Sequence, residues 1–177
     1  RNSMLTLAHW NPHWECFAKE PSCKAGAVSA LDTLLGPSYG IKADFFSVIE
    51  FEVDTYVPPA PYALIGNFQS CGHDWATLVY HNATWEIAST PLVGCLAAGR
   101  SFAAATFRRR AAAAGAELAV VAAHFPQTQH NASAYAEATA SLRGALQKLG
   151  PAAMTAVLAD TNTESPSAAA ASAWHNT

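Results

Sequence analysis

Polar side chains of kinds that can perform chemistry follow four separate apolar runs in this 177-residue sequence. Carboxylates hold hard cations, imidazoles transfer protons, and Asn side chains orient ligands without adding charge. Residues that emerge from neighbouring strands at one rim of a sheet project into a shared site, so we expect these side chains to converge. They are Asn11, Glu50, His124 and the pair Asp160 and Asn162.

The runs that precede these residues have the length and composition of β-strands, and two helices are predicted along the chain. The first helix is expected to start with a Ser22 cap and to stop at Gly36-Pro37. The second runs from Ala132 to Leu149 with apolar residues at helical spacing. The Pro-rich stretch 57–61 is interpreted as a loop, 55–71 as one of the loops that set the substrate, and 111–115 as a turn. The predicted strands are 5–10, 43–51, 75–80, 85–88, 101–107, 117–123 and 154–159.

Composition sets limits on the class of protein. With 51% hydrophobic and 13% charged residues, the chain predicts one globular domain over residues 1–177, with an ordered core of about 4–162 and a Ser/Ala-rich tail. No apolar run reaches the roughly 20 residues of a membrane helix. A pI near 6.1 argues against a protein that coats nucleic acid, but not against a nuclease with a small cleft. The basic run 108–110 is interpreted as a solvated turn.

The four cysteines lack the paired spacing of a zinc site. Their even number, together with the glycosylation sequons at Asn82 and Asn131, favours an oxidising, extracytoplasmic compartment. The sequence leaves open whether disulfides form, and Cys16–Cys23 with Cys71–Cys95 is the simplest pairing. The start at Arg1, without Met or a leader, suggests a targeting peptide that has been removed.

Four segments, in order, resemble motifs of the endonuclease/exonuclease/phosphatase superfamily. Leu5–Asn11 is similar to its opening strand, and Ala43–Glu50 to the motif that usually ends in Gln-Glu, with Ile49 in place of Gln. The segment 120–126 is similar to the strand that ends in His-Leu, and 157–162 to Gly-Asp-x-Asn, with Ala159 in place of Gly. The resemblance implies an α/β fold, a four-layer αββα sandwich of two mixed β-sheets, the second incomplete in this chain.

The resemblance also implies roles for these residues. Glu50, with Asn11, would hold Mg²⁺ or Mn²⁺, while Asn11 and Asn162 would orient the phosphate. Asp160 would position the attacking nucleophile, and His124 would donate a proton or bind the phosphate. In the deoxyribonuclease I-like branch, which the chain resembles most, a carboxylate pairs with the motif His and an Arg contacts phosphate. Asp74 and Arg100 stand in those places.

One family motif, a Ser-Asp-His near the carboxyl end, has no match in this sequence, and the context of His175 does not fit it. The expected function is therefore hydrolysis of a phosphodiester, in nucleic acid or a small or lipid molecule, conditional on that motif. The first alternative is a catalytically inactive accessory subunit, whose open sheet edge would be covered by partner subunits. The second is a domain that binds phosphate ligands without turnover. The other histidines, at 9, 13, 73, 81 and 130, are interpreted as surface or packing residues.

Overall fold

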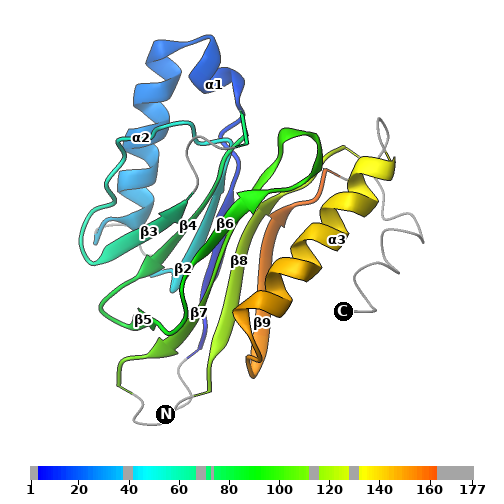
Figure 1. Cartoon of the computed structure of the whole chain (residues 1–177). Coiled ribbons are helices and arrows are strands. Elements are labelled where there is room, and N and C mark those ends of the chain that lie inside the picture. The colour runs from blue at the N-terminus through cyan, green and yellow to red at the C-terminus, as the bar shows by residue number, and fades with distance from the viewer. Residues whose placement is uncertain are drawn as a thin grey trace.

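The computed structural model describes residues 4–37, 42–66, 71–72, 74–111, 116–127 and 132–162. Two β-sheets pack face to face, and helices cover their outer faces (Figure 1). Within these ranges, no helix has the length and hydropathy needed to cross a membrane. The elements are β1 (Leu7–Trp10), α1 (Glu15–Ala18), α2 (Pro21–Leu35), β2 (Phe45–Ile49), β3 (Tyr62–Gly66), β4 (Ala76–His81), β5 (Trp85–Ile87), β6 (Leu92–Cys95), a 3₁₀ turn (Ala97–Gly99), β7 (Ser101–Arg109), β8 (Leu118–His124), α3 (Ala132–Leu149) and β9 (Met154–Asp160).

The first sheet contains four strands in the order β1-β2-β4-β3. β1 and β2 run parallel, whereas β4 is antiparallel to both β2 and β3. Every residue of β2 is buried. One face of this strand, with Phe46 and Val48, packs under Leu31 and Leu35 of α2. The other face, with Phe45, belongs to the core between the sheets. Burial on both faces explains why β2 reads as a continuous apolar run.

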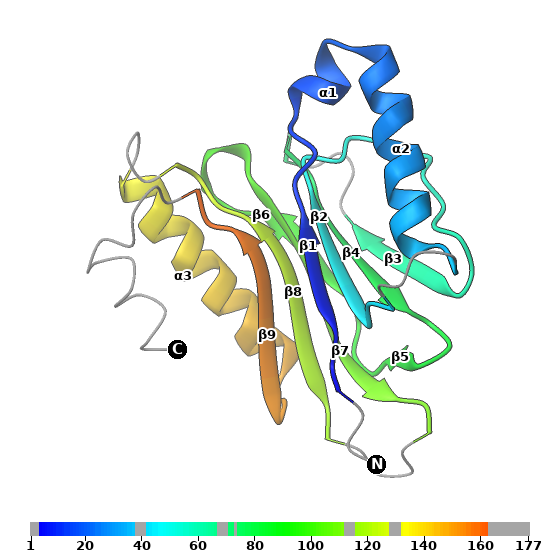
Figure 2. The same cartoon turned by 180° about the vertical axis from the view of Figure 1, so that it is seen from behind.

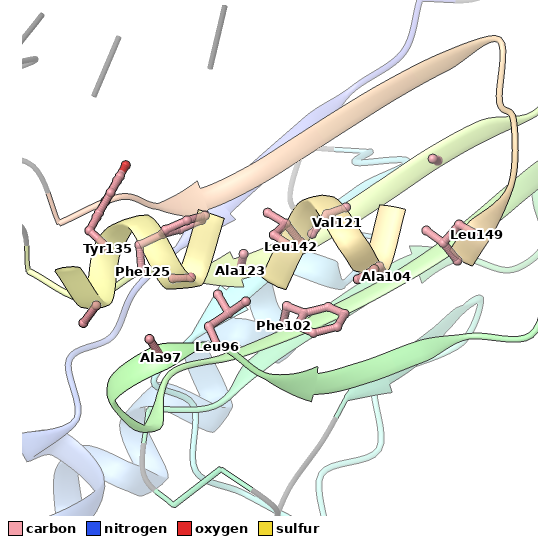
Figure 3. Packing of buried hydrophobic residues seen from close by; sticks show 14 residues of the cluster. Leu96, Ala97, Phe102, Ala104, Val121, Ala123, Phe125, Tyr135, Leu142 and Leu149 are labelled. Atoms are coloured by element: carbon pink, nitrogen blue, oxygen red, sulfur yellow. The ribbon is translucent and has the colours of Figure 1, made fainter. Parts of the chain in front are cut away.

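The second sheet contains five strands, ordered β5-β7-β8-β9 with β6 also paired to β7. β8 is antiparallel to β7 and parallel to β9. Two parallel neighbours need a crossover connection, and α3 provides it. Tyr135, Leu142 and Leu149 form the buried face of this helix, which packs on the sheet near Phe102 and Val121 (Figure 3). The crossover through α3 makes β8 and β9 run in the same direction, so both strands end at the same edge of the sheet.

The predicted fold class, two mixed sheets with helices outside, is confirmed, and α3 has the bounds that were expected. The expected Ser22 cap is wrong, because the helix begins at Pro21 after Glu20. Proline suits the first helical position, since it has no N–H to leave unpaired. The Pro-rich stretch 57–61 contains no helix or strand, as predicted, whereas the interpretation of the whole range 55–71 as a loop is wrong because β3 lies within it. β6 was not predicted, because it is short and its residues alternate between partly buried and exposed.

Both predicted disulfides form. Cys16–Cys23 joins α1 to α2, and Cys71–Cys95 joins the segment before β4 to the end of β6. Several predictions concern residues outside the described ranges, and the structure says nothing of them. These are residues 112–115 of the expected turn, His73, His130, the sequon at Asn131, His175 and the tail 163–177.

Candidate active site

The carboxyl ends of β1, β2, β8 and β9 lie at one rim of the sandwich, the end at which α1 begins (Figure 2). β4 is antiparallel to β2, and β7 is antiparallel to β8. β4 and β7 therefore start at the rim where β2 and β8 end. The topology thus brings together residues that follow four strands and residues that precede two. They are Asn11, Glu50, His124, Asp160, Asn162, Asp74 and Arg100. All seven residues predicted for the site lie at this rim.

Asp160 is held by two amide groups. The Asn11 Nδ2 atom donates to Asp160 Oδ2 at 2.8 Å, and the Asn162 backbone amide donates to Oδ1 at 3.0 Å. Burial raises the pKa of Asp160, but these hydrogen bonds lower it by more, so that the pKa lies below its ordinary value. Asp160 is therefore a carboxylate at neutral pH, with an orientation that both sheets determine.

His124 is fully buried at the end of β8. Its Nε2 atom lies 2.8 Å from Asn162 Nδ2, which also donates to the Phe125 carbonyl at 2.7 Å. An amide nitrogen can only donate, so Nε2 is the acceptor and the neutral ring carries its proton on Nδ1. Burial and the charge of Arg100 lower the pKa of His124 to about 4. The imidazole is uncharged at neutral pH.

Glu50 follows β2 and is only 6% exposed. Its Oε2 atom accepts a hydrogen bond of 2.5 Å from the backbone amide of Trp14, and its Oε1 atom lies 3.4 Å from His124 Nε2. Because that ring is neutral, the second contact is no ion pair at neutral pH. Burial raises the pKa of Glu50, the Trp14 hydrogen bond lowers it, and the charge of Asp74 raises it, with a net rise. A buried carboxylate near the negative charge of Asp74 favours a bound cation.

Asp74 and Arg100 form an ion pair beside His124. The same guanidinium Nη1 atom lies 3.4 Å from His124 Nδ1, and the backbone of Asp74 hydrogen-bonds to the ring. Ser101 supports this arrangement by donating to the Asp74 carbonyl and accepting from the Ala76 amide. With its proton on Nδ1, His124 accepts no hydrogen bond from Arg100, so the guanidinium pairs with the Asp74 carboxylate and lies beside the ring, where the sequence predicted a direct pair of Asp74 and His124.

One ligand atom each from Glu50, Asp74 and His124 lies within 4.8 Å of the others, a group that could hold a metal ion. The Nε2 lone pair of His124 is engaged by Asn162, and Asp74 is paired with Arg100. Glu50 is buried and feels the negative charge of Asp74, so its carboxylate is the group that a bound cation would stabilise most. Its carboxylate oxygens fit Mg²⁺ or Mn²⁺, which prefer oxygen ligands and retain several waters.

Three of the site residues have backbones in the left-handed region. The φ angles are 58° for Glu50, 66° for Asp74 and 48° for Asn162. Such angles cost residues other than glycine about 1–3 kcal/mol each, and they concentrate at functional sites. Here each lies next to a strand end, where the chain turns abruptly and the side chain is directed into the rim.

Two features of this rim could not be recognised in the sequence. Trp14 lies beside Glu50, but an aromatic residue in a loop gives no chemical signal in a sequence. His9 was interpreted as a surface or packing residue, and its Nδ1 atom lies 3.2 Å from Ser47 Oγ. Ser47 itself donates to the Leu158 carbonyl at 3.0 Å, which connects β2 to β9. This link through Ser47 was not predicted, because the residues around Ser47 in β2 are all apolar.

No protein-family model and no curated protein sequence matches this chain. Solved structures do match. A mannosyl-6-phosphatase from Bacteroides thetaiotaomicron has a TM-score of 0.70 at 14% identity, over 98% of this chain and 71% of that protein. The human Nocturnin catalytic domain with bound sulfate has a TM-score of 0.66 at 15% identity, over 89% of this chain and 63% of that one.

A third match is D. rerio TDP2 complexed with a single-strand DNA product, with a TM-score of 0.63 at 16% identity, over 92% of this chain and 62% of that chain. The chain therefore spans less than two thirds of the length of the Nocturnin and TDP2 structures. Matches at 14–16% sequence identity show similarity of fold alone. Another matching structure, also from B. thetaiotaomicron, is described as an endonuclease/exonuclease/phosphatase family protein and has a TM-score of 0.64. This chain has the fold of the endonuclease/exonuclease/phosphatase superfamily.

Proposed function

We propose that this chain carries the phosphate-activating part of a divalent-metal-dependent phosphodiester hydrolase. The observation that carries the proposal is the convergence of Glu50, Asp74 and His124 within 4.8 Å at the rim shared by both sheets. The similar structures support a phosphoester substrate, since one is a mannosyl-6-phosphatase and another holds a single-strand DNA product. In this proposal, activity also needs the family's Ser-Asp-His motif, which has no match in this sequence.

In this proposal Glu50, with Asn11, holds Mg²⁺ or Mn²⁺. When bound, the cation neutralises charge on a phosphate oxygen. Arg100 and Asn162 contact the phosphate, and Arg100 supplies a permanent positive charge. Asp160, fixed by Asn11, orients and polarises the attacking water.

His124 has a narrower role than the sequence suggested. With a pKa of about 4, it is not an imidazolium at neutral pH. It can act as a neutral hydrogen-bonding group through the proton on Nδ1. Its Nε2 atom fixes the amide of Asn162, so that the amide oxygen of Asn162 is turned away from the ring. We infer that His124 orders the phosphate contact of Asn162.

An accessory, non-catalytic role is the second candidate, because two strands at sheet edges expose apolar side chains. Leu7 of β1 is 39% exposed and Met154 of β9 is 60% exposed. Edge strands of this kind can pair with a further chain. This role predicts stoichiometric co-purification with other subunits, and a native mass equal to that of one chain would contradict it.

The hydrolase is tested with the full-length protein, using a dinucleotide and bis(p-nitrophenyl) phosphate as substrates, with and without Mn²⁺. Glu50→Gln keeps the shape of the side chain but removes its charge, and we expect at least a 100-fold loss of metal-stimulated kcat/KM. Glu86→Gln is the matched control, since Glu86 is paired with Arg108 on a surface of β5 and β7. Equal rates for Glu50→Gln and the parent protein would refute the assignment of Glu50.

A further inference from the structure

Trp14 is a partly exposed aromatic residue directly beside the candidate metal site. It is 38% exposed, although a large apolar ring at a surface loses the benefit of burial. Its backbone amide donates to Glu50 Oε2 at 2.5 Å. A phosphate held at Glu50 would therefore lie within a side-chain length of the indole. A base is separated from its phosphate by one sugar, a span of the same order as a side chain.

The turn that carries Trp14 is fixed by the site itself. The amide of His13 donates to Asn11 Oδ1 at 2.8 Å, and the amide of Trp14 donates to Glu50. His13 adopts a φ of 72°, an unfavourable angle that these two hydrogen bonds stabilise. The Cys16–Cys23 disulfide then ties the following helix to α2. The position of Trp14 is thus coupled to both Asn11 and Glu50.

A positive charge accompanies the ring. The Lys19 ammonium lies 4.9 Å from the centroid of the Trp14 ring, and it pairs with Glu15 at 2.5 Å. The His13 ring lies 6.1 Å from the indole with an interplanar angle of 28°. The cation–π contact restricts the Trp14 rotamers before any ligand binds, which reduces the entropy lost on binding.

Resting on the proposed hydrolase function, we propose that Trp14, with Lys19, forms a stacking surface for the nucleobase next to the scissile phosphate. The substrate class is then a single-stranded nucleic acid or short oligonucleotide. Stacking of a base on an aromatic side chain contributes about 1–3 kcal/mol and tolerates any base. Lys19 adds attraction for the neighbouring phosphate of the strand. A saturated sugar phosphate would gain less, because it has no π-face to stack and no second phosphate.

The experiment compares binding of two inert probes to the full-length protein by calorimetry in the presence of Mn²⁺. One probe is a dithymidine phosphorothioate, and the other is its abasic analogue with two tetrahydrofuran units. We expect the parent protein to bind the base-bearing probe about 10-fold to 100-fold more tightly, in line with the stacking energy. Trp14→Ala should abolish this preference, and Trp14→Phe should retain most of it.

Met154→Ala is the control, because Met154 is an exposed apolar residue at the opposite end of β9. This variant should keep the preference of the parent protein. The stacking proposal is overturned if Trp14→Ala weakens both probes equally, or if neither affinity changes. It is also overturned if mannose 6-phosphate depends on Trp14 as strongly as the dithymidine probe does. Because binding needs no turnover, failure of hydrolysis would remove the hydrolase proposal without deciding this one.

Discussion

Asn11 and Asp160 are 149 residues apart in the sequence, and a hydrogen bond of 2.8 Å joins their side chains. Asn11 follows the first strand of one sheet, and Asp160 ends the last described strand of the other. The bond therefore joins the ends of β1 and β9 at the rim of the sandwich. It also lowers the pKa of Asp160, since an amide donor stabilises the charged carboxylate.

This bond predicts a measurable coupling between the two residues. Asn11→Ala, Asp160→Ala and the double variant should give a coupling free energy of unfolding of about 0.5–3 kcal/mol, as for other residues in direct contact. Urea unfolding provides the measurement. The exposed pair Glu86 and Arg108 serves as the control cycle and should couple by no more than about 1 kcal/mol. Strictly additive effects of Asn11→Ala and Asp160→Ala would contradict the finding.

Metal binding should stabilise the fold through Glu50. A ligand that binds only the folded state at 100 times its Kd raises the free energy of unfolding by about 2.7 kcal/mol. We therefore expect Mn²⁺ to raise the Tm and EDTA to reverse the rise. Glu50→Gln should lose this response while keeping an unchanged or higher Tm without metal, because it removes a buried charge. The control Glu86→Gln should respond as the parent does, and an undiminished response of Glu50→Gln would disprove the site.

The buried His124 predicts a dependence of stability on pH. Its pKa is about 4 in the fold, against 6.5 ordinarily, so the unfolded chain binds a proton between these values that the folded chain does not. Stability is then complete above pH 6.5 and falls as the pH decreases toward 4, by up to about 3 kcal/mol. Chemical denaturation of the metal-free protein at several pH values measures this loss.

His124→Asn separates this effect from others, because it keeps a polar side chain that does not titrate. Its stability should change less than that of the parent between pH 6.5 and 4. Glu50 acts in the opposite direction, because its raised pKa makes the folded chain bind a proton at a higher pH than the unfolded chain does. Glu50 is present in both the parent protein and His124→Asn. Below the ordinary pKa of Asp160, whose folded pKa is lowered, both proteins should lose stability. Parallel profiles down to pH 4 would contradict the buried neutral imidazole.

The strand-end pattern made the rim predictable from sequence. Apolar runs identified β1, β2, β8 and β9, and the residues that follow them lie together because parallel strands emerge at one edge. Asp74 and Arg100 came from resemblance alone, and their ion pair could not be foreseen because it depends on how β4 of one sheet packs against β7 of the other. The left-handed backbone conformation of Glu50 could not be predicted from the sequence either, since Glu has no preference for that region.

Other elements escaped prediction for local reasons. β3 follows a Pro-rich segment, and its pattern of partly buried residues is weaker than that of a central strand. β6 pairs with β7 at a sheet edge, where Gly94 leaves room for the Phe102 ring. A Cβ added at Gly94 would lie 2.9 Å from that ring, so the ring would have to shift to accommodate any other residue. Nothing in the sequence alone distinguishes such a glycine from one that marks a loop.

The two disulfides give the last prediction. Removing a cross-link frees the unfolded chain, and the effect grows with the length of the closed loop. The Cys71–Cys95 bond spans 24 residues, so Cys71→Ala with Cys95→Ala should cost about 3.5 kcal/mol. The Cys16–Cys23 bond spans 7 residues, and its removal should cost about 2.4 kcal/mol.

The two bonds also differ in what they hold near the site. Cys71 lies in the segment that leads to Asp74, whereas Cys16 and Cys23 anchor the helix that follows Trp14. Loss of the first bond should therefore weaken Mn²⁺ binding and phosphodiester hydrolysis. Loss of the second should mainly reduce the preference for base-bearing probes. Calorimetry with Mn²⁺ and with the dithymidine probe, below the unfolding transition of each variant, separates the two effects. Equal losses of both affinities in both variants would show that the disulfides act only on global stability.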